Sequence, residues 1–259
     1  MKKVFYFLVV NAVIVSSAFQ NLSAQEITNQ ETTKNSTLPS FQLLLSGNLG
    51  YVPNSSMDKA VKSYGDFTAI ELNAVNIGDP FKGEDKKSVL GAGVDLEGRF
   101  FLGSIGFGLS AGYQYGGESK STAKASGYAS EKYLSLTLTA ISYLGTAYYR
   151  HVINETSFLL LGVGGGYYQG TMKLTEEAKK FLNDNFKDKI DFKGNALGGH
   201  IKLEYNRMLG SATLFGGVMG RYVNIDKFKK NGIALTSNGS NIEGGFSGLL
   251  LYCGVGMNF

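Results

Sequence analysis

Eight segments of about ten residues alternate apolar with polar or small side chains, and this alternation limits the possible folds more than any other feature. A period of two places successive side chains on opposite faces of a β-strand. Between residues 105 and 114, for example, Ile105 and Phe107 share one face, whereas Gly106 lies on the other. The segments are residues 41–51, 90–100, 105–114, 134–145, 159–170, 197–205, 213–222 and 249–259. The sequence therefore predicts an all-β protein.

The composition agrees with this fold class and excludes several kinds of site. The chain has 35 glycines but only three prolines, and after Pro80 no missing backbone donor bars a residue from a sheet. Hydrophobic residues make up 43% of the chain, too many for a disordered protein. The only cysteine is Cys253, so no intramolecular disulfide can form. With only His151 and His200 beside it, a Cys/His zinc site cannot be assembled, and we expect no metal or cofactor.

Residues 1–24 predict an export signal that is removed. They begin with Met1-Lys2-Lys3, continue through an apolar run, and end in small residues at Ala24. An uncleaved anchor is the alternative, but Asn11 interrupts the run, which is shorter than the ~20 residues that cross a bilayer. Residues 25–39 are polar and predict a flexible periplasmic tail. The rest carries no basic stripe with interleaved aromatic residues, so nucleic acid is not an expected partner.

The connections between the segments decide between a soluble β-sandwich and a membrane barrel, because both folds show alternation. Short connections lie near residues 103, 152–156 and 208–211, and long ones at 53–88, 116–131, 172–193 and 224–243. This order is typical of outer-membrane barrels, which have short periplasmic turns and long outer loops. We predict that residues 40–259 form an eight-stranded antiparallel up-and-down transmembrane β-barrel with four long outer loops.

The apolar face of each strand should then contact lipid, and the face of small and charged residues should line the lumen. Tyrosines at segment ends fit aromatic girdles: Tyr51, Tyr113, Tyr133, Tyr148, Tyr167, Tyr205 and Tyr222. In the fourth segment this expectation turns five residues outward: Leu134, Leu136, Leu138, Ala140 and Leu144.

The last twelve residues, 248–259, end on Phe259 and place apolar residues at every second position before it, including Leu251, Val255 and Met257. This pattern resembles the targeting signal that the barrel assembly machinery recognises in bacterial outer-membrane proteins. Together with the export signal and the loop alternation, residues 40–259 resemble the small eight-stranded barrels typified by the OmpA membrane domain, OmpX and OmpW. The resemblance is architectural. It implies the outer membrane of a Gram-negative-type bacterium, with lipid and the assembly machinery as partners.

Charged residues on the small-residue face predict a plug in the lumen. An eight-stranded barrel has an interior that side chains can fill. The second and sixth segments lie on opposite walls, so residues equally far from their turns share a depth. The resulting pairs are Arg99 with Glu204, Glu97 with Lys202, and Asp95 with His200, with Arg221 higher on the seventh segment. Because buried charges are costly unless paired, we predict a charge-paired plug, with a gated proton or ion path as the alternative.

The sequence gives no support for catalysis. Hydrolases and acyltransferases of the serine type need a serine, a histidine and an acid in contact. No serine lies one strand away from His200 at its depth, His151 lies near a turn, and no G-x-S-x-G motif occurs.

Two long connections predict short helices, at residues 175–186 and at Ser55–Tyr64. Their apolar faces would either cap the barrel mouth or contact a partner. Lys227, Lys229 and Lys230, with Phe228, predict a contact with anionic lipopolysaccharide or, alternatively, a solvated basic turn.

These features predict a non-enzymatic outer-membrane barrel that acts through its surface loops, by adhesion or by binding lipid or a partner, or through envelope integrity. The alternative is a narrow transporter or porin for small or apolar solutes, as the resemblance to OmpW-type barrels allows. A lipid-modifying enzyme is the third class.

Overall fold

The computed structural model describes residues 38–75, 82–86, 89–124, 131–179, 185–237 and 239–259. The predicted export signal and most of the predicted tail lie outside these residues. The longer elements are β1 (Phe41–Tyr51), α2 (Ser55–Val75), β3 (Leu90–Leu102), β4 (Ile105–Lys124), β5 (Glu131–Asn154), β6 (Ser157–Lys179), β7 (Asn185–Leu209), β8 (Ala212–Ile225) and β14 (Gly248–Asn258). The shorter ones are β2 (Lys82–Lys86), β9 (Lys229–Lys230), β10 (Ile233–Ala234), β11 (Thr236–Ser237), β12 (Ser240–Asn241) and β13 (Gly244–Gly245).

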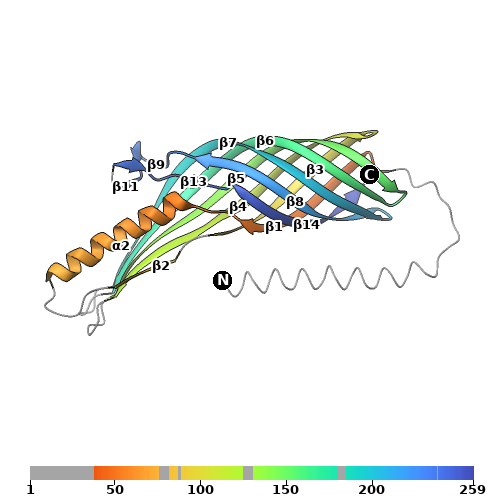
Figure 1. Cartoon of the computed structure of the whole chain (residues 1–259). Coiled ribbons are helices and arrows are strands. Elements are labelled where there is room, and N and C mark those ends of the chain that lie inside the picture. The colour runs from red at the N-terminus through yellow and green to blue at the C-terminus, as the bar shows by residue number, and fades with distance from the viewer. Residues whose placement is uncertain (1–37, 76–81, 87–88, 125–130, 180–184, 238) are drawn as a thin grey trace, which may run out of the picture. The chain divides into compact units, whose positions relative to one another are not determined.

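Eight strands form a closed antiparallel ring in the order β1–β3–β4–β5–β6–β7–β8–β14, and β14 pairs with β1 (Figure 1). The predicted eight-stranded up-and-down barrel is therefore confirmed. Tight turns join β3 to β4, β5 to β6 and β7 to β8, and we call this the turn end of the barrel. Gly103 and Gly210 occupy two of these turns with φ of 62° and 64°, which glycine adopts without the strain a side chain would add. The opposite end, where α2 lies, is the helix end.

An apolar belt covers the outward face of the ring next to the turn end. Its side chains are exposed although they are large and hydrophobic; Leu109, for example, is 77% exposed. Every strand of the ring contributes, with Leu45, Leu96, Phe107, Tyr143, Val163, Ile201, Val218 and Leu251 among its members. The outward direction predicted for the apolar residues is thus confirmed in all segments except residues 134–145.

Strands β4 to β7 continue past the belt toward the helix end, and we call this part of the barrel the extension (Figure 1). The predicted loops at 116–131 and 172–193 are therefore largely strand. The helix predicted at residues 175–186 is wrong, because the chain remains in β6 as far as Lys179 and is strand again from Asn185. Thr175 pairs with Ser135 on β5 and with Lys189 on β7, so the ladder of backbone hydrogen bonds continues through this region.

The extension encloses a hydrophobic core of its own, and this core reverses the predicted orientation of β5. Leu136 and Leu138 are almost fully buried and point inward, where they pack with Met172 of β6 and Phe192 of β7. The five residues predicted to face lipid all point inward: Leu134, Leu136, Leu138, Ala140 and Leu144. Above a membrane belt the outside of a barrel meets water, so the apolar side chains of Leu134, Leu136 and Leu138 are stable on the inside there. Leu144 lies lower, opposite Ser110 and Gly166 at the level of the belt, and this reason does not apply to it.

Helix α2 closes the core of the extension from the open side. Met57, Ala60 and Val61 belong to the same hydrophobic cluster as the inward side chains of β5, β6 and β7, and α2 lies against β4 and β5. The helix predicted at Ser55–Tyr64 is confirmed and continues to Val75. Within the described residues, no helix is long and apolar enough to cross a membrane.

Polar contacts hold α2 at its start and near its middle. Asn54 caps the helix, because its carbonyl accepts the first helical bond from the N–H of Asp58 at 3.0 Å. Its side-chain amide donates to the carbonyl of Gly116 at 2.6 Å. Further along, the Tyr64 hydroxyl donates to Glu176 of β6 at 2.5 Å. The helix is therefore part of the packed extension.

Candidate functional site

The centre of the lumen holds four charged side chains in mutual contact. Arg99 of β3 donates two hydrogen bonds to the carboxylate of Glu204 on the opposite strand β7, at 2.5 and 2.9 Å. A third bond from Arg99 reaches Glu97 at 3.0 Å, and Lys202 Nζ lies 3.4 Å from the same carboxylate. We call these four residues the lumen quartet. The structure thus brings together the pairs Arg99–Glu204 and Glu97–Lys202 that strand depth predicts.

All four side chains of the quartet are buried in the interior of the barrel. Arg99 is 1% exposed and Glu204 is fully buried. The quartet carries two positive and two negative charges, so its formal charges cancel. Buried charges that are paired and hydrogen-bonded in this way are stable in a low-dielectric interior, whereas single ones are not.

Aromatic rings pack beside the quartet. The guanidinium of Arg99 lies 4.6 Å from the ring centroid of Tyr148 and 5.5 Å from that of Phe215. The Tyr148 hydroxyl also donates to Glu97 at 2.5 Å. Tyr148 is therefore inside the lumen, and its predicted place in an aromatic girdle is wrong. The signal was available in the sequence, because Thr146 and Arg150 share its face and Tyr149 lies on the other.

A second polar cluster surrounds Asp95 nearer the helix end. Asn48 of β1 and Gln114 of β4 each donate to the Asp95 carboxylate at 2.9 Å. Arg221 donates to Gln114 at 2.9 Å and to the carbonyl of Phe246 at 2.7 Å. The sequence analysis missed both amides, although each lies on the small-residue face of its own segment.

Gly93 makes room for this second cluster. It lies opposite both Asn48 and Gln114 on the neighbouring strands. A Cβ at this glycine would lie 2.3 Å from the Gln114 side-chain oxygen, closer than atoms approach. The missing side chain therefore allows the two amides to reach Asp95.

The predicted pairing of Asp95 with His200 does not occur. His200 Nε2 lies 2.9 Å from the Thr146 hydroxyl on β5, two strands away across Gly164 of β6, while Asp95 is satisfied by its own neighbours. Strand depth predicts the level of a residue but not which neighbour its side chain reaches. The second ring nitrogen of His200 has no hydrogen-bond partner within the described residues, so no acid orients this histidine as a catalytic triad requires.

The C-terminal residues close the ring at the turn end. Two backbone hydrogen bonds join Phe41 and Phe259, at 2.9 and 3.3 Å, and their rings lie 5.8 Å apart. We call this β1–β14 contact the seam. Leu251, Val255 and Met257 point outward into the belt. In the part of the chain that the structure describes, no cluster of three His, Cys, Asp or Glu side chains could hold a metal ion.

No protein-family model and no curated protein matches the chain. Among solved structures, the chain is similar to Neisserial surface protein A at 12% identity and a TM-score of 0.43, over 85% of this chain and 97% of that one. It is also similar to Ail, the attachment invasion locus protein of Yersinia pestis, at 10% identity and a TM-score of 0.33, over 86% of this chain and all of that one. At these values the likeness concerns the fold alone. The resemblance to the small eight-stranded outer-membrane barrels is confirmed in architecture by the ring of strands itself.

Proposed function

We propose that the protein is a non-enzymatic outer-membrane barrel with a closed lumen, and that it acts through the surface of its extension. The observation that carries this proposal is the lumen quartet, which fills the barrel with buried side chains whose charges cancel. A filled interior leaves the outer surface as the part of the molecule that can meet a partner.

The apolar belt supports a position within a membrane. Monomeric soluble proteins rarely expose continuous apolar patches larger than a few hundred Å². Here exposed large hydrophobic residues surround the barrel, while its charges lie in the lumen or beyond the belt. The turn end, with its short connections and the seam, would face the periplasm, and the extension would project from the cell.

The export signal and the C-terminal signal support the same placement. After export through residues 1–24, the barrel assembly machinery would recognise Phe259 and the alternating residues before it. Insertion would then place the belt in contact with outer-membrane lipid in a Gram-negative-type bacterium.

The extension supports a role in binding rather than transport. Its inward residues form a core closed by α2, and its outward residues are polar and include Thr137, Gln169, Lys173 and Asp191. A ladder of hydrogen-bonded strands presents this outward surface in one conformation, which lowers the entropy cost of binding. Adhesion, binding of a surface partner and support of the envelope all fit such a surface.

Planar-bilayer conductance of the refolded barrel tests the proposal. A lumen filled by the quartet should give no steady open channel. Stable openings of the wild-type protein, without denaturant, would overturn the closed lumen and favour transport.

A narrow transporter for apolar solutes is the second candidate. The specific observation in its favour is the apolar interior of the extension, with Leu138, Met172 and Phe192 pointing inward above the polar lumen. Uptake of a small apolar dye into vesicles that contain the barrel would support this candidate. Equal uptake by empty vesicles and by vesicles with the barrel would contradict it.

A further inference from the structure

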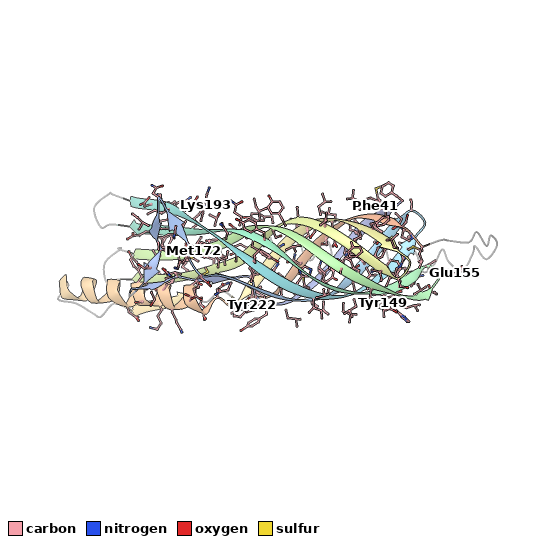
Figure 2. The ribbon with its side chains drawn as sticks, turned by 90° about the horizontal axis from the view of Figure 1, so that it is seen from above. Phe41, Tyr149, Glu155, Met172, Lys193 and Tyr222 are labelled. Carbon is pink, nitrogen blue, oxygen red and sulfur yellow. The ribbon has the colours of Figure 1, made fainter. Side chains whose placement is uncertain are left out.

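A row of hydrogen-bond donors crosses three neighbouring strands on the outward face of the extension. Lys193 of β7 lies opposite Lys229 of β9 on one side and opposite Thr171 of β6 on the other. Directly opposite residues have Cβ atoms about 4.5–5.5 Å apart and share one face. Both lysines are exposed, and buried Phe192 next to Lys193 fixes this face as the outer one. Figure 2 labels Lys193 on the extension. We call these three residues the lysine row.

The lysine pair departs from the charge pattern around it. Two other charged residues on the outward face of β7 lie opposite partners of opposite sign: Lys187 opposite Glu177, and Asp191 opposite Lys173. Like charges directly opposite each other destabilise a strand pair. Within the described residues neither Lys193 nor Lys229 forms an ion pair. An anion held between the two ammonium groups would remove their repulsion.

The outward face changes in polarity between the belt and the lysine row. Leu197, which is 80% exposed, lies opposite Tyr167 at the edge of the belt. The next outward pair toward the helix end is Asn195 with Gln169, and the pair after that is Lys193 with Thr171. The order is apolar, then amide, then cation with hydroxyl. A phospholipid shows the same order from its acyl chains through its ester groups to its phosphate.

The spacing places the lysine row just outside the headgroup layer and within reach of it. Four residues separate Leu197 from Lys193, which is about 13 Å along a strand and about 10 Å along the normal of a barrel with typical strand tilt. The headgroup layer on each side of a bilayer is roughly 5–8 Å thick. Lysine side chains extend back toward this layer while their stems remain on the protein surface. The ammonium groups can therefore reach a lipid phosphate.

We propose that the lysine row binds the phosphate of an anionic lipid in the leaflet next to the extension. The proposal rests on the membrane placement proposed above and adds a specific lipid site at the outer edge of the belt. The acyl chains of the lipid would contact Leu197 and Tyr167, and its phosphate would accept hydrogen bonds from Lys193, Lys229 and Thr171. Because the lysine row adjoins the apolar residues Leu197 and Tyr167, a lipid fits the site better than a soluble polyanion, which has no acyl chains to contact them.

Isothermal titration calorimetry of the refolded barrel in maltoside micelles tests the proposal, with dioctanoyl phosphatidic acid as the probe. The wild type should bind it saturably and should not bind dioctanoyl phosphatidylcholine. Replacing one lysine should weaken binding roughly fivefold, and Lys193→Gln with Lys229→Gln should weaken it about thirtyfold. The control Lys59→Gln with Lys189→Gln removes the same charge away from the row and should retain most of the affinity. Equal losses in both double variants would overturn the site in favour of diffuse charge.

Lys229→Glu separates a lost site from a lost fold. It turns the like-charge pair into a complementary one, so it should raise the thermal stability of the lipid-free barrel while abolishing phosphatidic acid binding. Loss of that stability gain, or retained binding, would overturn the argument. Inorganic phosphate that binds as tightly as the lipid, or heparin that binds more tightly, would replace the lipid by a free anion or a polysaccharide. Heat-modifiable migration shows in every sample that the barrel is folded, so failure of this site stays distinct from failure of the closed barrel.

Discussion

Removing one member of the lumen quartet should destabilise the barrel by an amount that follows from the contacts. Within the described residues Arg99 is the only cation that forms an ion pair with Glu204. Arg99→Ala therefore leaves a buried carboxylate uncompensated, which costs about 3–5 kcal/mol of unfolding free energy. The loss of the ring contacts with Tyr148 and Phe215 adds about 1 kcal/mol or more.

Glu204→Ala should lower the unfolding free energy by less than Arg99→Ala does. After Glu204→Ala the guanidinium of Arg99 retains the Glu97 carboxylate at 3.0 Å, so we expect about 3 kcal/mol, the lower end of the range for a broken buried pair. The double variant has no uncompensated charge from this pair. It should cost about 2 kcal/mol less than the sum of the single variants.

Equilibrium urea unfolding in vesicles measures these free energies, with the folded fraction read from heat-modifiable migration. The exposed ion pair Lys62–Asp66 on α2, at 2.8 Å, is the control and should show a coupling of only about 0.3–0.5 kcal/mol. Additive costs for Arg99 and Glu204 would refute the reasoning, because residues in contact must couple. Single variants that keep their stability and open a conductance would identify the quartet as a gate.

Three further outcomes test the orientation of the strands and the seam. Leu138→Ala should cost about 2–5 kcal/mol of unfolding free energy, and Thr137→Ala on the outward face should stay within about 0.5 kcal/mol; reversed costs would mean that β5 faces the other way. Deleting Phe259 should leave export intact but lower the heat-modifiable fraction, and unchanged insertion would contradict its role in closing the ring. In vesicles Cys253 should react with a lipid-soluble maleimide and not with a charged one, whereas Ile233→Cys in a Cys253→Ser background should react with both. Fast reaction of Cys253 with the charged reagent would place the belt outside the bilayer.

The part of the barrel that the apolar belt surrounds can be predicted from the sequence, because one rule sets the direction of its side chains. Lipid outside and polar groups inside make the strand period and the direction of each face readable from residues such as Leu109 and Ile201. The depth argument also places Arg99 beside Glu204, because opposite strands of a ring with short turns share their levels.

The extension does not follow from the sequence for a physical reason. Beyond the belt the solvent changes from lipid to water, so the same alternation of leucine with serine and threonine in residues 134–140 reverses its faces. No sequence signal in β5 marks the position at which the surroundings change from lipid to water. The failed helix at residues 175–186 has a related cause, because strong local helix signals at Thr175 and Glu176 yield to strand pairing on both sides.

The detailed partners in the lumen are also beyond the sequence. Asp95 bonds to Asn48 and Gln114 because Gly93 leaves space between them, and His200 turns to Thr146 instead. Such choices depend on side-chain packing within a narrow tube. The inward positions of Asp95 and His200 were predictable, but their hydrogen-bond partners were not.

The seam has a consequence for the timing of biosynthesis. It pairs β1 with β14, and β14 follows every other strand of the ring in the chain. Until β14 has been made, the free edges of β1 and β8 expose unpaired backbone groups, which invite pairing with other chains. The ring cannot close early around a shorter set of strands without losing the register that aligns Arg99 with Glu204. The unfolded chain must therefore stay sheltered until β14 is available, and the ring can close only after the whole chain has been made.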